Sequence, residues 1–194
     1  MMQLTAYFAR TVAPTVCALT LLMSTNVAHA QAAADSTATA APATATAPSD
    51  TLIGYEYRKV EQLINSKRWA AALSSANTYL QGNPRDPQMR LLKSRILHAQ
   101  DKPTEALQLL QELTQEYPEI PEPHNNLAVL QAQAGNVEEA RLSLETALRL
   151  KPNYSVAQEN LGDIYVRMAR NAYTHALSLN PGSAALRQKI NKLP

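Results

Sequence analysis

The chain has 194 residues, with 18 Lys and Arg against 16 Asp and Glu and a formal net charge of +2. This near-neutral balance argues against binding to nucleic acid, which requires a concentrated basic face. Only five glycines and one cysteine are present, so the chain has little material for Gly-rich phosphate loops or paired-cysteine sites.

The first thirty residues have the layout of a secretory signal peptide. They contain no acidic residue, Arg10 is their one side-chain cation, and a mainly apolar stretch follows from Val12 to Met23. The tripeptide AHA, which ends at Ala30, fits an A-x-A cleavage site. The apolar stretch is shorter than the ~20 residues that a spanning helix needs. We therefore expect cleavage between Ala30 and Gln31, export to the periplasm and no membrane span afterwards, with a retained anchor as the alternative.

Residues 31–51 form a linker rich in Ala, Thr, Pro and Ser. Without large apolar side chains, this segment cannot bury enough surface to offset the entropy lost on ordering. We expect a disordered spacer here. The remainder, residues 52–194, is long enough for one domain with a continuous core.

A spacing of 34 residues organises this domain. Two sets of residues recur at that interval: Pro84, Pro118 and Pro152, and Ala72, Ala106 and Ala140. The period resembles that of the tetratricopeptide repeat, a helix-turn-helix unit. The resemblance implies an all-α fold, a right-handed α-solenoid of helix pairs. It implies about three full repeats, near residues 53–86, 87–120 and 121–154, and a shortened repeat at 155–182.

The third repeat, residues 121–154, matches the family pattern best. Small and apolar residues stand where two helices cross closely: Leu127, Ala128, Ala140, Leu144 and Ala147. His124 replaces the family's Trp, so we expect it to be a packed core ring. Gly135 predicts a left-handed turn, and Asn136 predicts an N-terminal cap on the second helix.

The last repeat lacks five residues at its turn. Tyr165 and Ala169, which match the two sides of that turn, are four residues apart, whereas the corresponding residues of the third repeat are nine apart. We expect one continuous helix from about Ser155 to Leu179, opened by a capping box of Ser155 and Gln158. A short capping helix from Ser183 to about Lys192 should follow.

A pair of asparagines, Asn126 and Asn160, lies one repeat apart. In the family, first helices line a concave groove, and O-linked N-acetylglucosamine transferases hold a peptide backbone with an asparagine ladder at this position. An amide both donates and accepts hydrogen bonds, which suits an extended main chain. The resemblance implies these groove residues: Asn125, Asn126, Val129, Gln133, Glu159, Asn160, Asp163 and Arg167. The alternative is that they are merely solvated polar positions.

Nothing in the sequence predicts catalysis, a metal site or a cofactor. His98 and His175 lack companions at metal-ligand spacing. Residues 121–181 resemble a group of bacterial exported tetratricopeptide repeat proteins. We therefore expect a non-catalytic periplasmic scaffold that binds a protein or peptide and serves as an accessory to cell-envelope machinery. The alternative is a self-associating structural module, a homo-oligomer without a peptide ligand.

Overall fold

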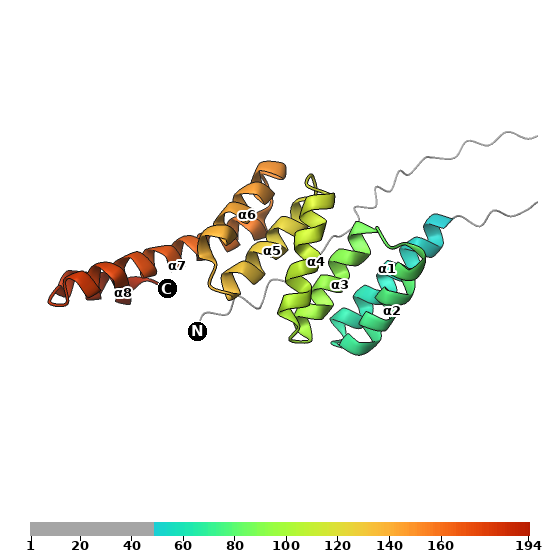
Figure 1. Ribbon diagram of the computed structural model, residues 1–194, viewed down its shortest axis with the longest axis horizontal. Coiled ribbons are helices and arrows are strands. Elements are labelled where there is room, and N and C mark those ends of the chain that lie inside the picture. The colour runs from blue at the N-terminus through green and yellow to red at the C-terminus, as the bar shows by residue number, and fades with distance from the viewer. Residues whose placement is uncertain (1–48) are drawn as a thin grey trace, which may run out of the picture.

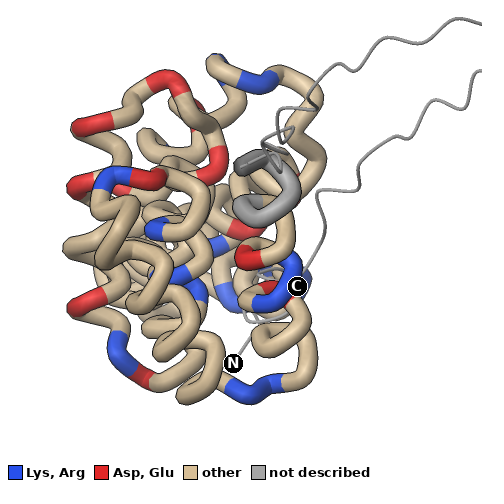
Figure 2. The backbone as a smooth tube through the Cα atoms, turned by 90° about the vertical axis from the view of Figure 1, so that its right-hand side faces the viewer, with Lys and Arg blue, Asp and Glu red and all other residues tan. Residues whose placement is uncertain are grey.

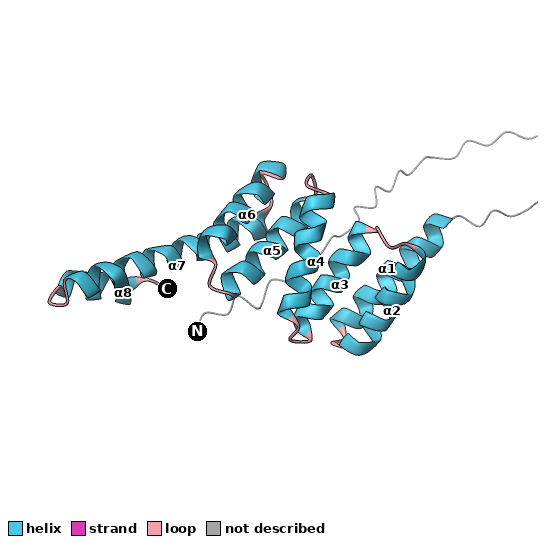
Figure 3. Ribbon diagram, in the orientation of Figure 1, coloured by secondary structure: helices cyan, strands magenta, loops and turns pink. Residues whose placement is uncertain are grey.

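The computed structural model describes residues 49–194, with side chains from Gly54 onward. The predicted signal peptide and most of the predicted linker lie outside the described residues. Within the described part, all regular structure is helical (Figure 3). The helices are α1 (Ser49–Asn65), α2 (Trp69–Gly82), α3 (Pro87–Ala99), α4 (Pro103–Glu116), α5 (Pro121–Gln133), α6 (Val137–Leu150), α7 (Ser155–Leu179) and α8 (Ala184–Lys192). Helix α1 thus begins three residues before the expected start of the domain.

Consecutive helices pack against one another along the whole described chain, and the pairs stack into an elongated array (Figure 1). The first helices of neighbouring pairs also touch: α1 contacts α3, and α5 contacts α7. The predicted all-α solenoid of helix pairs is therefore confirmed.

Small residues of the second helices explain the close packing. Ala72 in α2, Ala106 in α4 and Ala140 in α6 have no exposed surface. Each lacks atoms beyond Cβ, so the facing first helix can approach closely while its larger apolar side chains fill the neighbouring space. The 34-residue interval places this contact at the same level in each of the three full repeats.

The three full repeats turn in the same backbone conformation. Lys67, Asp101 and Gly135 have φ values of 56°, 59° and 88°, and each lies 34 residues from the next. The left-handed turn predicted at Gly135 is confirmed, and two non-glycine residues adopt it as well. Asn136 lies at the N-cap of α6, but its side chain makes no capping hydrogen bond. That prediction is wrong because ψ of 70° lies outside the extended region in which a cap side chain reaches the helix amides.

Helix α7 is the predicted continuous helix, with 25 residues from Ser155 to Leu179. The predicted capping box is wrong, because Tyr154 occupies the N-cap position and Ser155 already lies inside the helix. Ser183 does cap α8, since its Oγ accepts from the amide of Leu186 at 3.3 Å. Figure 1 shows the end of α7, together with α8, projecting beyond the body of the solenoid.

Candidate functional site

Three buried asparagines connect the first helices of the last two repeats. Asn125, Asn126 and Asn160 are 3%, 9% and 6% exposed. Asn160 Nδ2 donates to Asn125 Oδ1 at 2.9 Å, and Asn125 Nδ2 donates to Asn126 Oδ1 at 3.2 Å. The alternative that these three residues are solvated surface positions is therefore wrong.

The asparagine chain leaves one donor and one acceptor at its ends. Asn126 Nδ2 and Asn160 Oδ1 make no hydrogen bond to another described residue. Neither atom is among the fully buried unpartnered atoms of this part of the chain. The pair can therefore offer one N–H and one C=O to an approaching main chain.

The remaining predicted residues lie on the same two helices, α5 and α7, and differ in exposure. Gln133 and Glu159 are exposed, Asp163 is partly buried, and Val129 is buried. Gln133 Oε1 lies 2.8 Å from His98 Nε2 and so connects α5 to α3. Arg167, partly buried, donates to the carbonyl of Ala132, a contact that ties α7 to α5.

Arg95 on α3 is a candidate residue that sequence reasoning missed. Its Nε is buried and has no hydrogen-bond partner among the described residues. Burial lowers the pKa of its guanidinium, whereas the nearby Glu61 carboxylate and Tyr154 raise it. Arg95 stands one and two repeat lengths before Val129 and Asp163, so the repeat register could have identified it. A guanidinium stays charged under all ordinary conditions, so Arg95 is a cation with incomplete hydrogen bonding on the first-helix side.

Tyr154, in the connection before α7, interacts electrostatically with Arg95. Burial, with help from the Glu122 carboxylate, raises the pKa of Tyr154 to about 12, while Arg95 opposes the rise. Lys151 Nζ lies 4.8 Å from the Tyr154 ring centroid and pairs with Glu122 at 3.2 Å. The phenol is therefore protonated at neutral pH and can donate a hydrogen bond in the same region as the Arg95 charge.

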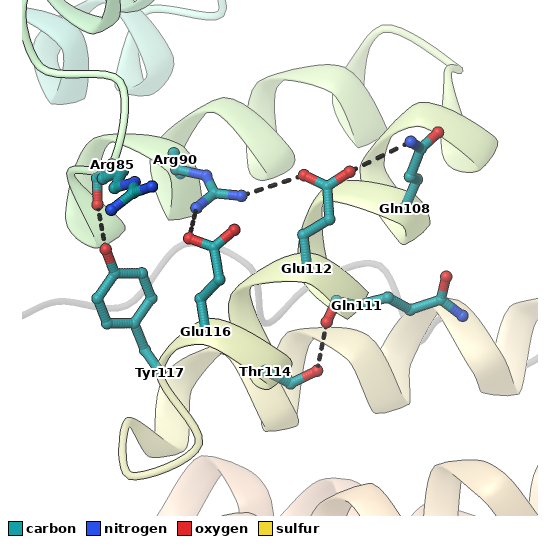
Figure 4. A network of polar contacts seen from close by, with 8 residues as sticks. All are labelled: Arg85, Arg90, Gln108, Gln111, Glu112, Thr114, Glu116 and Tyr117. Atoms are coloured by element: carbon teal, nitrogen blue, oxygen red, sulfur yellow. Dashed lines mark hydrogen bonds and ion pairs between the residues drawn. The ribbon is translucent and has the colours of Figure 1, made fainter.

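A second charged cluster is structural in character (Figure 4). Arg90 on α3 contacts Glu116 at 2.7 Å and Glu112 at 3.1 Å on α4. Tyr117 donates to the carbonyl of Arg85 at 2.6 Å. The Arg90 pairs join the two helices of the second repeat, and the Tyr117 contact joins the end of α4 to the loop before α3. Elsewhere, positions of both charge signs are distributed over the described solenoid (Figure 2).

His124 is not the packed core ring expected from the sequence. It is only partly buried, and its Nε2 lies 3.1 Å from the carbonyl oxygen of Pro118. The ring sits near the start of α5, where the preceding loop supplies a polar partner. Among residues 54–194, no three His, Cys, Asp or Glu side chains gather as a metal site would require. Over the described helices, none has the length and apolar character needed to cross a membrane.

Comparison with known protein families identifies the tetratricopeptide repeat. The model of the tetratricopeptide repeat matches residues 63–121 and, in a second register, residues 97–164. These two segments together span more than half of the chain. No curated protein matches the chain in sequence.

Several solved structures share the fold. The chain is similar to the Sgt2 tetratricopeptide repeat domain from Aspergillus fumigatus, with a TM-score of 0.58 and 12% identity over 61% of this chain and 80% of that domain. It is also similar to the Yersinia enterocolitica type III secretion chaperone SycD in complex with a peptide of the translocator YopD, with a TM-score of 0.54 and 18% identity over 63% and 98%.

A third structure is the first repeat domain of Spaghetti (RPAP3) bound to the HSP90 peptide SRMEEVD. Its TM-score is 0.55, with 16% identity over 59% of this chain and 91% of that one. At these identities the three likenesses establish the fold.

Proposed function

Because the chain belongs to the tetratricopeptide repeat family, we propose that it is a non-catalytic scaffold that binds a protein or peptide on the side formed by α1, α3, α5 and α7. The signal-like residues 1–30 support a place of action in the periplasm, and there we propose that the scaffold serves cell-envelope machinery.

The observation that carries this proposal is the asparagine chain between α5 and α7. Its two free ends, Asn126 Nδ2 and Asn160 Oδ1, are one donor and one acceptor held by buried side chains. An extended peptide presents carbonyl and amide groups along its main chain, so such a pair can bind it without reading its side chains. Because burial fixes the amides in place, less conformational entropy is lost on binding.

Arg95 and Tyr154 suggest the charge of the ligand. A guanidinium with incomplete hydrogen bonding and a protonated phenol together favour a carboxylate. Two of the similar structures contain peptides, and the HSP90 peptide bound to Spaghetti has the acidic sequence SRMEEVD. This supports an extended peptide segment with acidic groups as the class of ligand.

In-cell photo-crosslinking tests the proposal. The probes replace Gln133 and Glu159, which are exposed on α5 and α7, and the control probe replaces Glu139, which is exposed on α6. We expect both test positions to form adducts with the same partner protein and the control to form none. Equal adducts from all three positions, or adducts only between copies of this chain, would contradict binding on the first-helix side.

A further inference from the structure

The fourth repeat has the sequence of a helix pair but not its connection. In the third repeat, Gln131 and Ala140 stand nine residues apart on either side of the turn at Gly135. Their equivalents, Tyr165 and Ala169, are four residues apart inside one straight helix. Residues 168–179 therefore cannot fold back onto the first half of α7, residues 155–167. We refer to residues 168–194, the end of α7 with α8, as the C-terminal arm.

The first half of α7 lacks the cover that the other first helices have. Ala128 of α5 is 1% exposed. Its equivalent, Gly162, is exposed, and apart from its chain neighbours and the backbone of its own helix no heavy atom lies within 4 Å of the place where a Cβ would stand. One turn later, Tyr165 is 49% exposed. The first half of α7 thus presents a small residue and an aromatic ring that no second helix covers.

The C-terminal arm carries the complementary surface. Three positions of α6, Ala140, Leu144 and Ala147, are buried in the third repeat. Their equivalents in the arm are all partly exposed: Ala169, Tyr173 and Ala176. Within the arm, α8 packs on the end of α7, and Lys189 Nζ lies 5.3 Å from the Tyr173 ring centroid. No residue of α8 is itself buried.

Charge favours docking of the arm onto the body of a solenoid. The arm, residues 168–194, contains four Lys and Arg and no Asp or Glu, whereas residues 54–167 contain 13 Lys and Arg against 14 Asp and Glu. Two arms would therefore repel each other, while an arm and a body attract. In Figure 1 the arm of a chain points away from its own body, so the body that it meets belongs to another molecule.

We propose that two copies of this chain exchange their C-terminal arms and form a twofold dimer. The end of α7 in each copy packs as the missing second helix on the first half of α7 in the other copy. Helices α5 and α6 show the required pairing, in which Ser143 Oγ donates to Gln131 Oε1 at 2.8 Å. The equivalent residues are Ala172 of one copy and Tyr165 of the other. The exchange is reciprocal, so it closes as a dimer.

A second copy explains both uncovered faces at once. The two faces lie on the same chain, correspond to the two sides of a contact already formed in the third repeat, and are separated by a shortened connection that prevents them from meeting. In the dimer the two α7 helices run antiparallel, and the twofold axis passes near Arg167. The exchanged contact uses Gly162 and Tyr165 of α7 and not the asparagine chain, so this inference does not depend on the proposed ligand.

Restoring the turn should abolish the dimer. Residues 134–138, with the sequence AGNVE, are inserted between Arg167 and Met168 of the full chain, which gives the fourth repeat the spacing of the third. Sedimentation equilibrium should give twice the mass of a single chain for the unaltered protein and the mass of one chain for the insertion variant. Circular dichroism should show equal helix content for both. A monomeric unaltered protein at every concentration would overturn the proposal.

Disulfide trapping tests the exchanged geometry independently of folding effects. Gly162→Cys and Ala172→Cys are combined with Cys17→Ser. Ten residues of straight helix separate the two positions by about 15 Å, far beyond the ~7 Å between Cα atoms that a disulfide permits. Oxidation should yield a covalent dimer, and with the five-residue insertion it should yield an internally bridged monomer. Covalent dimers from the single-cysteine variants in equal yield would overturn the exchange.

Discussion

The third and fourth repeats carry the same pattern of small and apolar residues, but only the third folds onto itself. Helix α5 ends at Gln133 and α6 begins at Val137, with Gly135 at φ 88° between them. In the fourth repeat the five corresponding residues are absent and the helix continues to Leu179. The comparison shows that the packing pattern and the connection are separate properties of a repeat. Without the connection, the first half and the end of α7 each keep an uncovered packing surface, and the two surfaces cannot contact each other within one chain.

The largest difference between the two repeats should appear when equivalent core positions are truncated. Leu144→Ala removes a side chain that is 1% exposed, so we expect the free energy of unfolding to fall by about 3 kcal/mol. Tyr173→Ala, at the equivalent but partly exposed position, should have less than half this effect at protein concentrations where the chain is monomeric. Urea unfolding followed by circular dichroism measures both. Equal losses at low concentration would show that the arm is already covered.

The second repeat extends the comparison through a charged contact. Arg90→Met removes a guanidinium whose side chain is 8% exposed and which contacts Glu112 and Glu116 on the neighbouring helix. Because both carboxylates are 45% exposed, they can be rehydrated, and we expect a loss of only about 1–2 kcal/mol in urea unfolding. Arg141→Met is the control, since that arginine pairs with Glu138 and Glu145 within one helix surface. A larger loss for the control would contradict this assignment.

The turn that the fourth repeat lacks can be weakened in the third. Gly135→Ala forces a side chain into the left-handed region, so we expect the free energy of unfolding to fall by about 1 kcal/mol. Apart from the two chain neighbours, no heavy atom lies within 4 Å of the added Cβ, so the loss would report backbone conformation alone. Asp101→Gly relieves the same conformation in the second repeat and should not destabilise the protein. A Gly135→Ala variant as stable as the unaltered chain, or an Asp101→Gly variant that is clearly less stable, would contradict the shared geometry of the turns.

The asparagine chain between the two repeats should affect binding more than folding. Asn126→Ala removes the free donor and one internal acceptor, so we expect the yield of partner adducts from the Glu159 probe to fall about three- to tenfold. Asn136→Ala is the matched control, because that side chain makes no capping hydrogen bond. An unchanged adduct yield for Asn126→Ala would show that the asparagine chain does not contribute to binding of the partner.

The connection between the third and fourth repeats should make stability depend on alkaline pH. The pKa of Tyr154 is raised to about 12 in the folded chain, above the unfolded value of about 10. Its contribution to stability is therefore fully present below pH 10 and is lost as pH rises through about 12. Urea unfolding between pH 8 and 11 should show a steeper decline for the unaltered chain than for Tyr154→Phe. If the free energy of unfolding declined equally with pH in both chains, the Tyr154 phenol would be exposed to solvent.

The helical repeats could be predicted from the sequence because their causes are local. The 34-residue interval, the small residues at helix crossings and the glycine turn all act within one repeat. The length of α7 followed from the absence of Gly and Pro between Asp163 and Asn180. Cap geometry was mispredicted at Asn136 and Ser155, because residue type alone does not specify the ψ angle that a capping side chain needs.

The candidate site was predictable only in part. The repeat register placed Asn126 and Asn160 at equivalent positions, but whether their amides were free depended on Asn125, which bridges them in three dimensions. Arg95 and Tyr154 are 59 residues apart in sequence, and only the stacking of repeats brings them into one electrostatic environment.

The sequence by itself determined the fold class, the repeat boundaries to within a few residues and the single long helix, because periodicity and turn residues act at short range. The tertiary structure decided which polar groups are buried, which cation lacks a partner and which apolar faces stay uncovered. Burial depends on which segments, distant in sequence, pack against a residue, and a local sequence pattern does not specify those segments.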